Sequence, residues 1–185
     1  MNKVKTFAQK SSTTQEIIKY CNIVERRYGF KVAIIHIDNE SSLGNKFDDW
    51  TADKGITVEY SAPSTPEQNG PAERSGGVII TKARCMRIEA RLPEELWPEA
   101  FKVAAYVTNR TPSRRLDWKT PFEKLQLAMG LSPTKPNIAH LRAYGCRAYP
   151  LKYNIPRTQK LAPRAHIGYL VGYNSTNIFR VYIPS

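Results

Sequence analysis

Phe30-Lys-Val-Ala-Ile-Ile-His-Ile37 is the segment that indicates the fold class most strongly. It is short, rich in β-branched residues and almost entirely apolar, which is the pattern of a strand buried on both faces of a parallel sheet. The next residue is Asp38, at the carboxyl end of the predicted strand, where ligands bind in open α/β sheets. The segment therefore predicts an α/β fold with a polar site at the edge of its sheet.

The segments on both sides of this strand alternate between strand and helix. Val4–Ala8 is a candidate short strand, and Ser12-Thr-Thr14 begins a predicted helix that ends near Gly29. Residues 45–54 predict a short helix, and residues 56–60 predict another strand. The strand, helix, strand order indicates a β-α-β unit.

A loop is predicted next, in the stretch Ser61-Ala-Pro-Ser-Thr-Pro-Glu-Gln-Asn-Gly-Pro-Ala-Glu-Arg74. Residues 61–71 contain three prolines and Asn69-Gly70, and proline cannot join a strand ladder whereas Asn-Gly supplies turn geometry. A helix is predicted from Glu73 to Leu92. Its expected apolar face consists of Val78, Ala83, Cys85, Met86 and Ala90.

Three arginines of this predicted helix share the face of Glu73. At 100° per residue, side chains 11, 14 and 18 positions after Glu73 project within about 40° of its direction, and these are Arg84, Arg87 and Arg91. An exposed basic helix face is often simply solvated. The carboxylate at the head of the helix is what favours a functional interpretation.

Two further helices and a β-rich end follow. A helix opens at Pro93 and ends near Asn109, and another runs from Thr120 to about Met129. Trp97 and Trp118 have apolar neighbours, which favours core positions over binding platforms. Residues 131–136 indicate a linker. Segments rich in Tyr and β-branched residues then predict a small β unit from residues 141–150, 167–173 and 178–183.

The basic charge is concentrated in the second part of the chain. The net charge is +12, but residues 1–60 contain nine Lys and Arg against eight Asp and Glu, whereas residues 61–185 contain nineteen against eight. No acidic residue follows Glu123, while nine basic residues do. A region of one sign suits a polyanion, because each phosphate that is neutralised releases counterions. A merely soluble basic surface is the alternative.

Other classes of protein find little support. Cys21, Cys85 and Cys146 are odd in number and widely spaced, so buried free thiols are expected rather than disulfides or a zinc site. The three histidines are equally scattered. No stretch of about 18 apolar residues occurs and the start lacks the apolar part of a secretory signal, so we expect a soluble intracellular protein without a membrane partner.

Ordered motifs resemble the integrase region of copia-type LTR retrotransposon polyproteins, with fungal elements the most similar. The resemblance runs from about Gly29 to the end of the chain. It rests on Gly55-Ile56, residues 61–74, Lys82-Ala-Arg84, Leu92-Pro93, Leu96-Trp97, Glu99-Ala100, Asn109-Arg110-Thr-Pro112, Thr120-Pro121, Leu141, Tyr144-Gly-Cys146 and Gly168-Tyr-Leu-Val-Gly-Tyr173.

The resemblance implies a ribonuclease H-like fold and a metal-dependent polynucleotidyl transferase with an Asp, Asp, Glu site. Asp38 would be the second Asp and Glu73 the Glu, together holding Mg²⁺ or Mn²⁺ for 3′ processing and strand transfer of DNA. The nucleic-acid contacts that the resemblance implies are Gln68, Asn69, Arg74 and Lys82. The arginines that share the face of Glu73 are further candidate contacts, namely Arg84, Arg87 and Arg91.

The chain also departs from the family pattern. The family commonly has Asn-Gly-Gly-Glu after its Asp, whereas this chain has Asn39-Glu-Ser-Ser42. The first Asp of the family lies upstream of the segment that Met1–Ala8 resembles, so we expect the chain to be inactive alone. The expected organisation is a partial ribonuclease H-like core over residues 1–130 and a small basic β-rich extension over residues 131–185.

Three hypotheses follow. The first is a truncated integrase core that acts on element ends and target DNA, in the nucleus and with a cytoplasmic particle stage. The second is a nucleic-acid-binding or assembly module without chemistry. The third is a degenerate transposon remnant without selected function. RNA and a second copy of the chain are further partners that the first hypothesis allows.

Overall fold

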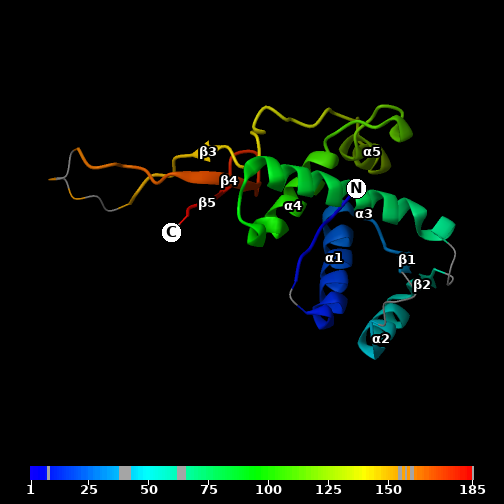
Figure 1. Cartoon of the computed structure of the whole chain (residues 1–185). Coiled ribbons are helices and arrows are strands. Elements are labelled where there is room, and N and C mark those ends of the chain that lie inside the picture. The colour runs from blue at the N-terminus through cyan, green and yellow to red at the C-terminus, as the bar shows by residue number, and fades with distance from the viewer. Residues whose placement is uncertain are drawn as a thin grey trace. The chain divides into compact units, whose positions relative to one another are not determined.

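A computed structural model of the chain describes residues 1–7, 9–37, 43–61, 66–153, 156, 158 and 161–184, without the side chains of residues 10, 66–69, 71 and 72. The chain divides into two compact units, Lys5–Gly76 and Met1–Val4 together with Gly77–Ser185. Both contain helices and strands, so the mixed class predicted from the sequence is confirmed (Figure 1). The predicted division after residue 130 stays a prediction.

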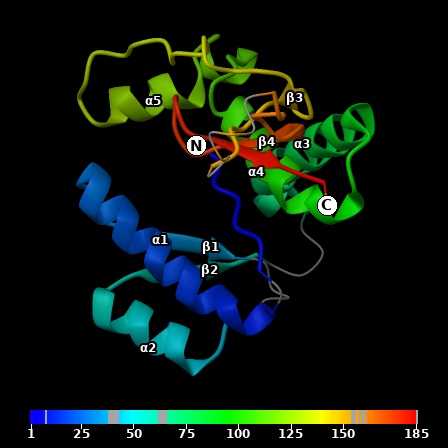
Figure 2. The same ribbon diagram turned by 90° about the vertical axis from the view of Figure 1, so that its left-hand side faces the viewer.

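The smaller unit contains a β-α-β arrangement, as the sequence predicts. Its elements are η1 Lys10–Ser12, α1 Thr13–Tyr28, β1 Ile34–Ile37, α2 Asn45–Lys54 and β2 Thr57–Tyr60. The two strands are parallel, with Ile34 opposite Thr57, and α2 connects them in sequence (Figure 2).

Glycines end both complete helices of this unit. Gly29 follows α1 with φ 71° and Gly55 follows α2 with φ 64°, in the left-handed region that glycine enters without a Cβ penalty. The unit's small core is formed around the fully buried Phe47, with Cys21 and Ile56 also buried. The Thr14 hydroxyl donates to the Leu43 carbonyl at 2.7 Å, so α1 is tied to the segment that precedes α2.

Two strand predictions were wrong in part. Residues 30–33 are not in a strand, and β1 alternates between exposed and half-buried residues rather than being buried on both faces; Ile34 is 49% exposed. The reason is that β2 is the only strand paired with β1 in the described part of the chain. Residues 4–7 of the candidate strand Val4–Ala8 form none.

Helix α3, Pro66–Ala90, begins earlier than predicted and replaces most of the expected loop. Proline at the first helical position costs no hydrogen bond, since the first N–H groups of a helix have no intrahelical partner. The apolar face also differs from the prediction. Ile79 and Ala83 are buried and Met86 packs against them, whereas Val78 is 46% exposed and Cys85 is exposed.

The larger unit continues with η2 Glu94–Leu96, α4 Trp97–Thr108, η3 Arg114–Leu116 and α5 Pro121–Ala128, close to the predicted helices. Its main core joins Ile79 and Ala83 of α3 to three alanines of α4, Ala100, Ala104 and Ala105. Small side chains at such a contact allow two helices to approach closely.

The predicted small β unit is confirmed as an antiparallel sheet in the order β3–β4–β5. Its strands are β3 Arg147–Ala148, β4 Gly168–Tyr173 and β5 Phe179–Tyr182. Leu170 and Val171 are buried, and both belong to the strand between the other two. Within the predicted segment 141–150, only residues 147–148 are in a strand.

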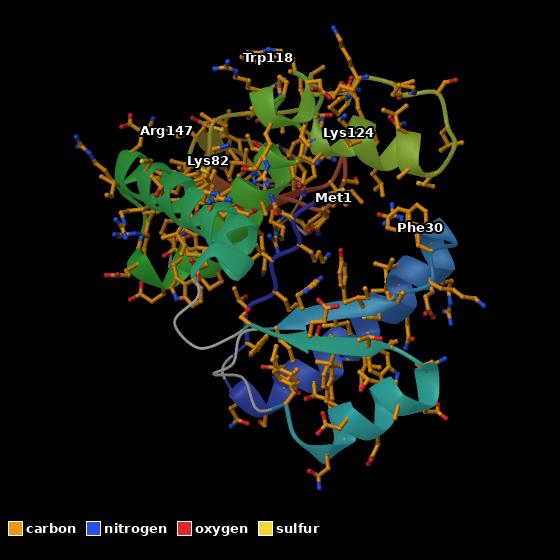
Figure 3. All side chains as sticks on the ribbon, turned by 90° about the vertical axis from the view of Figure 1, so that its right-hand side faces the viewer. Met1, Phe30, Lys82, Trp118, Lys124 and Arg147 are labelled. Carbon is orange, nitrogen blue, oxygen red and sulfur yellow. The ribbon has the colours of Figure 1, made fainter. Side chains whose placement is uncertain are left out.

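Three predicted core residues lie at the surface. Trp97 is 44% exposed and packs edge to face on Phe101, and Trp118 is 72% exposed (Figure 3). Asp117 and Trp118, the two residues after the short helix η3, have φ 54° and 58°, so a tight turn places Trp118 outside the core. Cys85 is exposed and Cys21 is buried; all three thiols are free. Among the described residues, no helix is both long and apolar enough to cross a membrane.

Candidate nucleic-acid interface

Only one member of the predicted metal pair lies in the described part of the chain. Glu73 is an exposed residue of α3 in the smaller unit, and Asp38 lies outside the described residues. Among the residues that are described, no three or more His, Cys, Asp or Glu side chains gather as a metal site would require. The pairing of Asp38 with Glu73 therefore stays a prediction.

The predicted contacts near Glu73 are helical rather than in a loop. Gln68 and Asn69 are the third and fourth residues of α3, and their side chains lie outside the description. Arg74 is exposed, and its Nη1 is 3.1 Å from the position that a Cβ on Gly70 would occupy. Glycine at position 70 therefore gives the Arg74 guanidinium room beside the helix.

The four remaining predicted contacts belong to the larger unit and have different surroundings. Arg84 is exposed and Arg87 is half-buried, both on α3. Lys82 donates to the Thr108 hydroxyl at 3.1 Å, so its ammonium group is already engaged with α4. Arg91 follows the end of the helix with φ 50°, which removes it from the helical face predicted for it. Of the predicted contacts in this unit, Arg84 and Arg87 lie on α3 as the predicted helix requires, and their contact with nucleic acid stays a prediction.

An aromatic cluster formed by Tyr106, His140, Tyr173 and Phe179 joins α4 to the β unit. Tyr106 stacks on Tyr173 with ring centroids 5.3 Å apart, and its hydroxyl is 2.9 Å from Nε2 of His140. Tyr173 also meets Phe179 edge to face. Burial raises the pKa of Tyr173 above its ordinary value. The helical repeat of α4 does not reveal this contact, because the partners are distant in sequence.

Arg110 lies over the outer side of this cluster. Its guanidinium carbon is 3.4 Å from the centroid of the Tyr106 ring, and Nη1 donates to the Tyr106 carbonyl at 3.1 Å. Burial lowers the pKa of Arg110, although its ordinary pKa is so high that it stays charged. This arginine holds the aromatic cluster together and is not a free phosphate contact.

A second contact that the sequence did not predict is an ion pair between Glu99 of α4 and Arg180 of β5. Both side chains are mostly buried, with 21% and 31% of their areas exposed, and Lys102 donates to the other oxygen of Glu99 at 2.9 Å. A Cβ on Gly172 would lie 2.6 Å from Nε of Arg180, so glycine makes room for the guanidinium. The pair fixes the β unit on α4.

Tyr144 lies in the same environment. Its hydroxyl is buried without a hydrogen-bond partner among the described residues, and its pKa is raised, first by burial and then by the charge of Glu99. The tyrosine therefore stays protonated. The sequence signal for it was the Tyr-Gly-Cys motif, which by itself names no partner.

The larger unit presents basic side chains on several elements. Exposed positions include Arg84, Arg114, Arg115, Arg142, Arg147 and Arg164. Since no acidic residue follows Glu123, nothing from residues 124–185 offsets this charge. Such a surface can attract the phosphates of a nucleic acid, with guanidinium groups offering paired donors.

Comparisons with known proteins identify relatives of this chain. Residues 146–185 match the retroviral polymerase SH3-like domain family. A retrovirus-related Pol polyprotein from transposon RE1 of Arabidopsis thaliana is 32% identical over 91% of the chain, one from transposon TNT 1-94 of Nicotiana tabacum is 33% identical over 86%, and one from transposon RE2 of Arabidopsis thaliana is 33% identical over 77%. These relatives come from plants, and the predicted similarity to fungal elements stays a prediction.

A solved structure was also found, a cryo-electron microscopy structure of the simian T-cell lymphotropic virus intasome in complex with PP2A regulatory subunit B56 gamma. It is 15% identical, with a TM-score of 0.49, over 97% of this chain and 63% of that chain. The matched region is 11%, 12% and 9% of the length of the three Pol polyproteins. The chain thus spans about a tenth of those relatives, and by its sequence it belongs to the retrovirus-related Pol polyproteins of copia-type transposons.

Proposed function

We propose that this chain is the integrase region of a retrotransposon Pol polyprotein, and that it binds DNA through the basic surface of its larger unit. The observation that carries the DNA-binding part of the proposal is the distribution of charge. The segment from Lys124 to Ser185 contains nine basic residues and no acidic one. Because binding to a polyanion gains free energy from counterion release, such a surface favours DNA without requiring base-specific contacts.

The integrase assignment rests on the motifs that surround Asp38 and Glu73 rather than on charge. In this proposal the smaller unit is part of a ribonuclease H-like core, and Asp38 is the next residue in the sequence after the carboxyl end of the parallel strand β1 at Ile37. That is the edge at which ligands bind in sheets of this kind. Element ends and target DNA are the proposed substrates, and the nucleus the proposed place of action.

Asp38 and Glu73 are the residues that would hold a divalent cation. Carboxylate oxygens are the ligands that Mg²⁺ prefers, and the Glu73 side chain is exposed, so it is accessible to a cation. When bound, Mg²⁺ or Mn²⁺ would help to deprotonate a nucleophile and stabilise a leaving oxygen. The resemblance implies that a third carboxylate completes the site.

The DNA-binding part of the proposal is tested by fluorescence anisotropy with a labelled duplex over a range of salt concentrations. We expect log K to fall linearly with log salt, by about 0.9 for each phosphate contacted. Arg84→Gln combined with Arg87→Gln should reduce that slope by about 2. Lys19→Gln is the matched control, since Lys19 already pairs with Glu16 at 3.0 Å and should leave the slope unchanged.

The catalytic part is tested separately, by Mg²⁺-dependent nicking or strand transfer on a duplex. Activity that is lost in both Asp38→Asn and Glu73→Gln would support chemistry at this pair. DNA binding that neither substitution changes, without nicking, would support the alternative of a binding module. Failure to bind any duplex at low salt would overturn both.

A further inference from the structure

A two-stranded arm extends from the β unit, beyond the short strand β3. Arg147 pairs with Tyr169 and Ala148 with Gly168, and the same register continues to a bridge between Leu151 and Ala165. Backbone bonds on both sides of that bridge are short, with Lys152 N donating to Arg164 O at 2.8 Å and His166 N to Pro150 O at 2.9 Å. We call residues 147–153 and 163–169 the arm; it is drawn in yellow and orange in Figure 1.

The register sorts the arm's side chains onto two different faces. Residues directly opposite each other in an antiparallel pair share a face, and neighbours along a strand alternate. Beyond Arg147 and Tyr169, the odd-numbered face contains only uncharged, mostly apolar residues: Tyr149, Leu151, Tyr153, Pro163, Ala165 and Ile167. The even-numbered face carries the charge, on Lys152 and Arg164, together with the imidazole of His166.

The apolar face is the more exposed of the two. Tyr149 is 62% exposed, Leu151 68%, Tyr153 89% and Ile167 60%. Exposed apolar residues that are scattered singly need no explanation, but a contiguous apolar face marks an interaction site. Within the described residues of the larger unit, nothing covers these four side chains.

A pocket of about 310 Å³ lies at the root of the same face. Tyr169, which belongs to the odd-numbered face, lines it together with its cross-strand partner Tyr182. The remaining walls are Ala90, Arg91, Leu92, Pro93 and Pro184. The pocket is thus apolar and aromatic with one guanidinium, which suits an aromatic side chain that carries a polar tip.

The arm therefore carries a projecting tyrosine at one end and a fitting pocket at the other. Tyr153 lies near the tip and Tyr169 at the root, six residues apart along the ribbon or about 20 Å at 3.4 Å per residue. If two arms pack face to face in opposite directions, each tip lies over the root of the other. An interface of that kind has two-fold symmetry and is self-complementary.

We propose that the apolar face of the arm binds the same face of a second copy of this chain, with Tyr153 of each copy in the root pocket of the other. The distribution of charge favours this partner. Lys152 and Arg164 would point outward on both sides of the pair, and each Arg147 would lie at a root, opposite the tip of the other arm, so the like charges of the two copies are kept apart. A polyanion would instead bind the basic face and leave the apolar face uncovered.

The size of the face sets the expected affinity. Aromatic side chains bury about 150–250 Å² each, so Tyr149 and Tyr153, which are 62% and 89% exposed, offer roughly 230–380 Å² on each copy and roughly 450–760 Å² for the pair. The total is below the roughly 1,200–2,000 Å² of a standard stable interface. We therefore expect a concentration-dependent dimer with a dissociation constant above about 1 μM.

Sedimentation equilibrium of the 185-residue chain tests this proposal. We expect a monomer and dimer equilibrium, and Tyr153→Ser should raise the dissociation constant at least about thirtyfold, because the two aromatic side chains that fill the root pockets are lost. Since Tyr153 is 89% exposed, the same variant should melt at an unchanged temperature. Lys152→Ser, one residue away on the opposite face, should dimerise like the unaltered chain.

Disulfide trapping places the contact. In a Cys85→Ser background, chains with Tyr153→Cys mixed with chains with Pro93→Cys should form a mixed disulfide, and Lys152→Cys with Pro93→Cys should not. A chain that stays monomeric at several hundred micromolar, or a dimer that survives Tyr153→Ser, would overturn the proposal. Loss of DNA binding by Tyr153→Ser at monomer concentrations would also overturn it, and would make the apolar face a nucleic-acid contact. Dimerisation does not depend on DNA binding, so the two proposals fail separately.

Discussion

The two compact units differ in how many apolar side chains they bury. In the smaller unit one large side chain, Phe47, is fully buried, and the paired strands β1 and β2 leave Ile34 and Tyr60 about half exposed. The larger unit buries a helix pair lined by alanines and the two β4 residues Leu170 and Val171. Its long-range contacts also include an ion pair and an aromatic cluster.

The difference shows that the units depend on different kinds of interaction. The smaller unit relies on a few apolar side chains in a generic β-α-β arrangement, so a single cavity should remove much of its stability. The larger unit relies on close approach and on specific polar and aromatic pairs, so steric and charge changes should affect it most. Substitutions matched between the units test this contrast.

Phe47→Ala should have the largest effect. Removing a fully buried aromatic side chain costs about 3–5 kcal/mol through lost burial and a residual cavity. Hydrogen exchange should show fast exchange of α1 and α2 amides, with the amides of α4 and β4 still protected. Equal loss of protection in both units would mean that they unfold as one, and the contrast would be wrong.

Gly145→Ala should come next, in the larger unit. Gly145 has φ 79°, and a Cβ there would lie 2.3 Å from the Cβ of Ala90 and 3.2 Å from its Cα. Overpacking together with left-handed strain should destabilise the larger unit by about 3 kcal/mol in urea unfolding. Gly130→Ala is the matched control. It has φ 72° but nothing within 4 Å of the added Cβ, so only the strain of about 1 kcal/mol should remain. Equal destabilisation by Gly145→Ala and Gly130→Ala would show that the contact with Ala90 adds no cost.

Glu99→Gln should destabilise the larger unit by about 2 kcal/mol, because it leaves the half-buried Arg180 without its carboxylate. If the pair were fully buried, breaking it would cost about 3–5 kcal/mol. A thermal melt measures the change. Glu94→Gln, an exposed residue of the same unit, should change stability by less than about 0.5 kcal/mol. A double-mutant cycle with Arg180→Gln should show coupling, and additivity within error would contradict the pairing.

Thr120→Ala should have the smallest effect, about 1 kcal/mol, through loss of the capping box that begins α5. The box also predicts a pH dependence. The Thr120 N–H donates to the Glu123 carboxylate at 2.8 Å, and this bond, followed by the one from the Thr120 hydroxyl, lowers the pKa of Glu123.

The sign of that pH dependence follows from the direction of the shift. A carboxyl group with a lowered pKa in the folded state stabilises the fold above its ordinary pKa of 4.5, and this contribution is lost as the pH falls through the folded value. Glu123→Gln should therefore lose less stability than the unaltered chain between pH 6 and pH 3 in urea titrations. The same acid loss in both proteins would show that the carboxylate is not bonded in solution.

Local signals predicted the elements well. Thr120-Pro-Phe-Glu123 predicts the start of α5, Gly29 and Gly55 predict the ends of α1 and α2, and the order of patterns predicts the parallel β1–β2 pair. These succeed because caps and turns depend on a few adjacent residues.

The errors fall where distant residues decide the outcome. Prolines and Asn-Gly predicted a loop where α3 begins at Pro66, since proline marks a helix start as readily as a turn. The exposed positions of Trp97, Trp118 and Cys85, and the engagement of Lys82 with Thr108, depend on packing partners that periodicity does not identify. The sequence predicted Arg84 and Arg87 as contacts from their helix face. It did not predict the pairing of Glu99 with Arg180, because those two residues are distant in the sequence.

The first residues of the chain have a consequence for the order of folding during synthesis. Asn2 N donates to the side chain of Asn109 at 2.7 Å, and the Asn109 amide donates back to the Asn2 carbonyl at 2.7 Å. At about 5–20 residues per second, Asn109 leaves the ribosome on the order of ten seconds after Asn2. All residues of the smaller unit lie between Asn2 and Asn109 in the sequence. The smaller unit can therefore fold before Asn109 has been synthesised and can bond to Asn2.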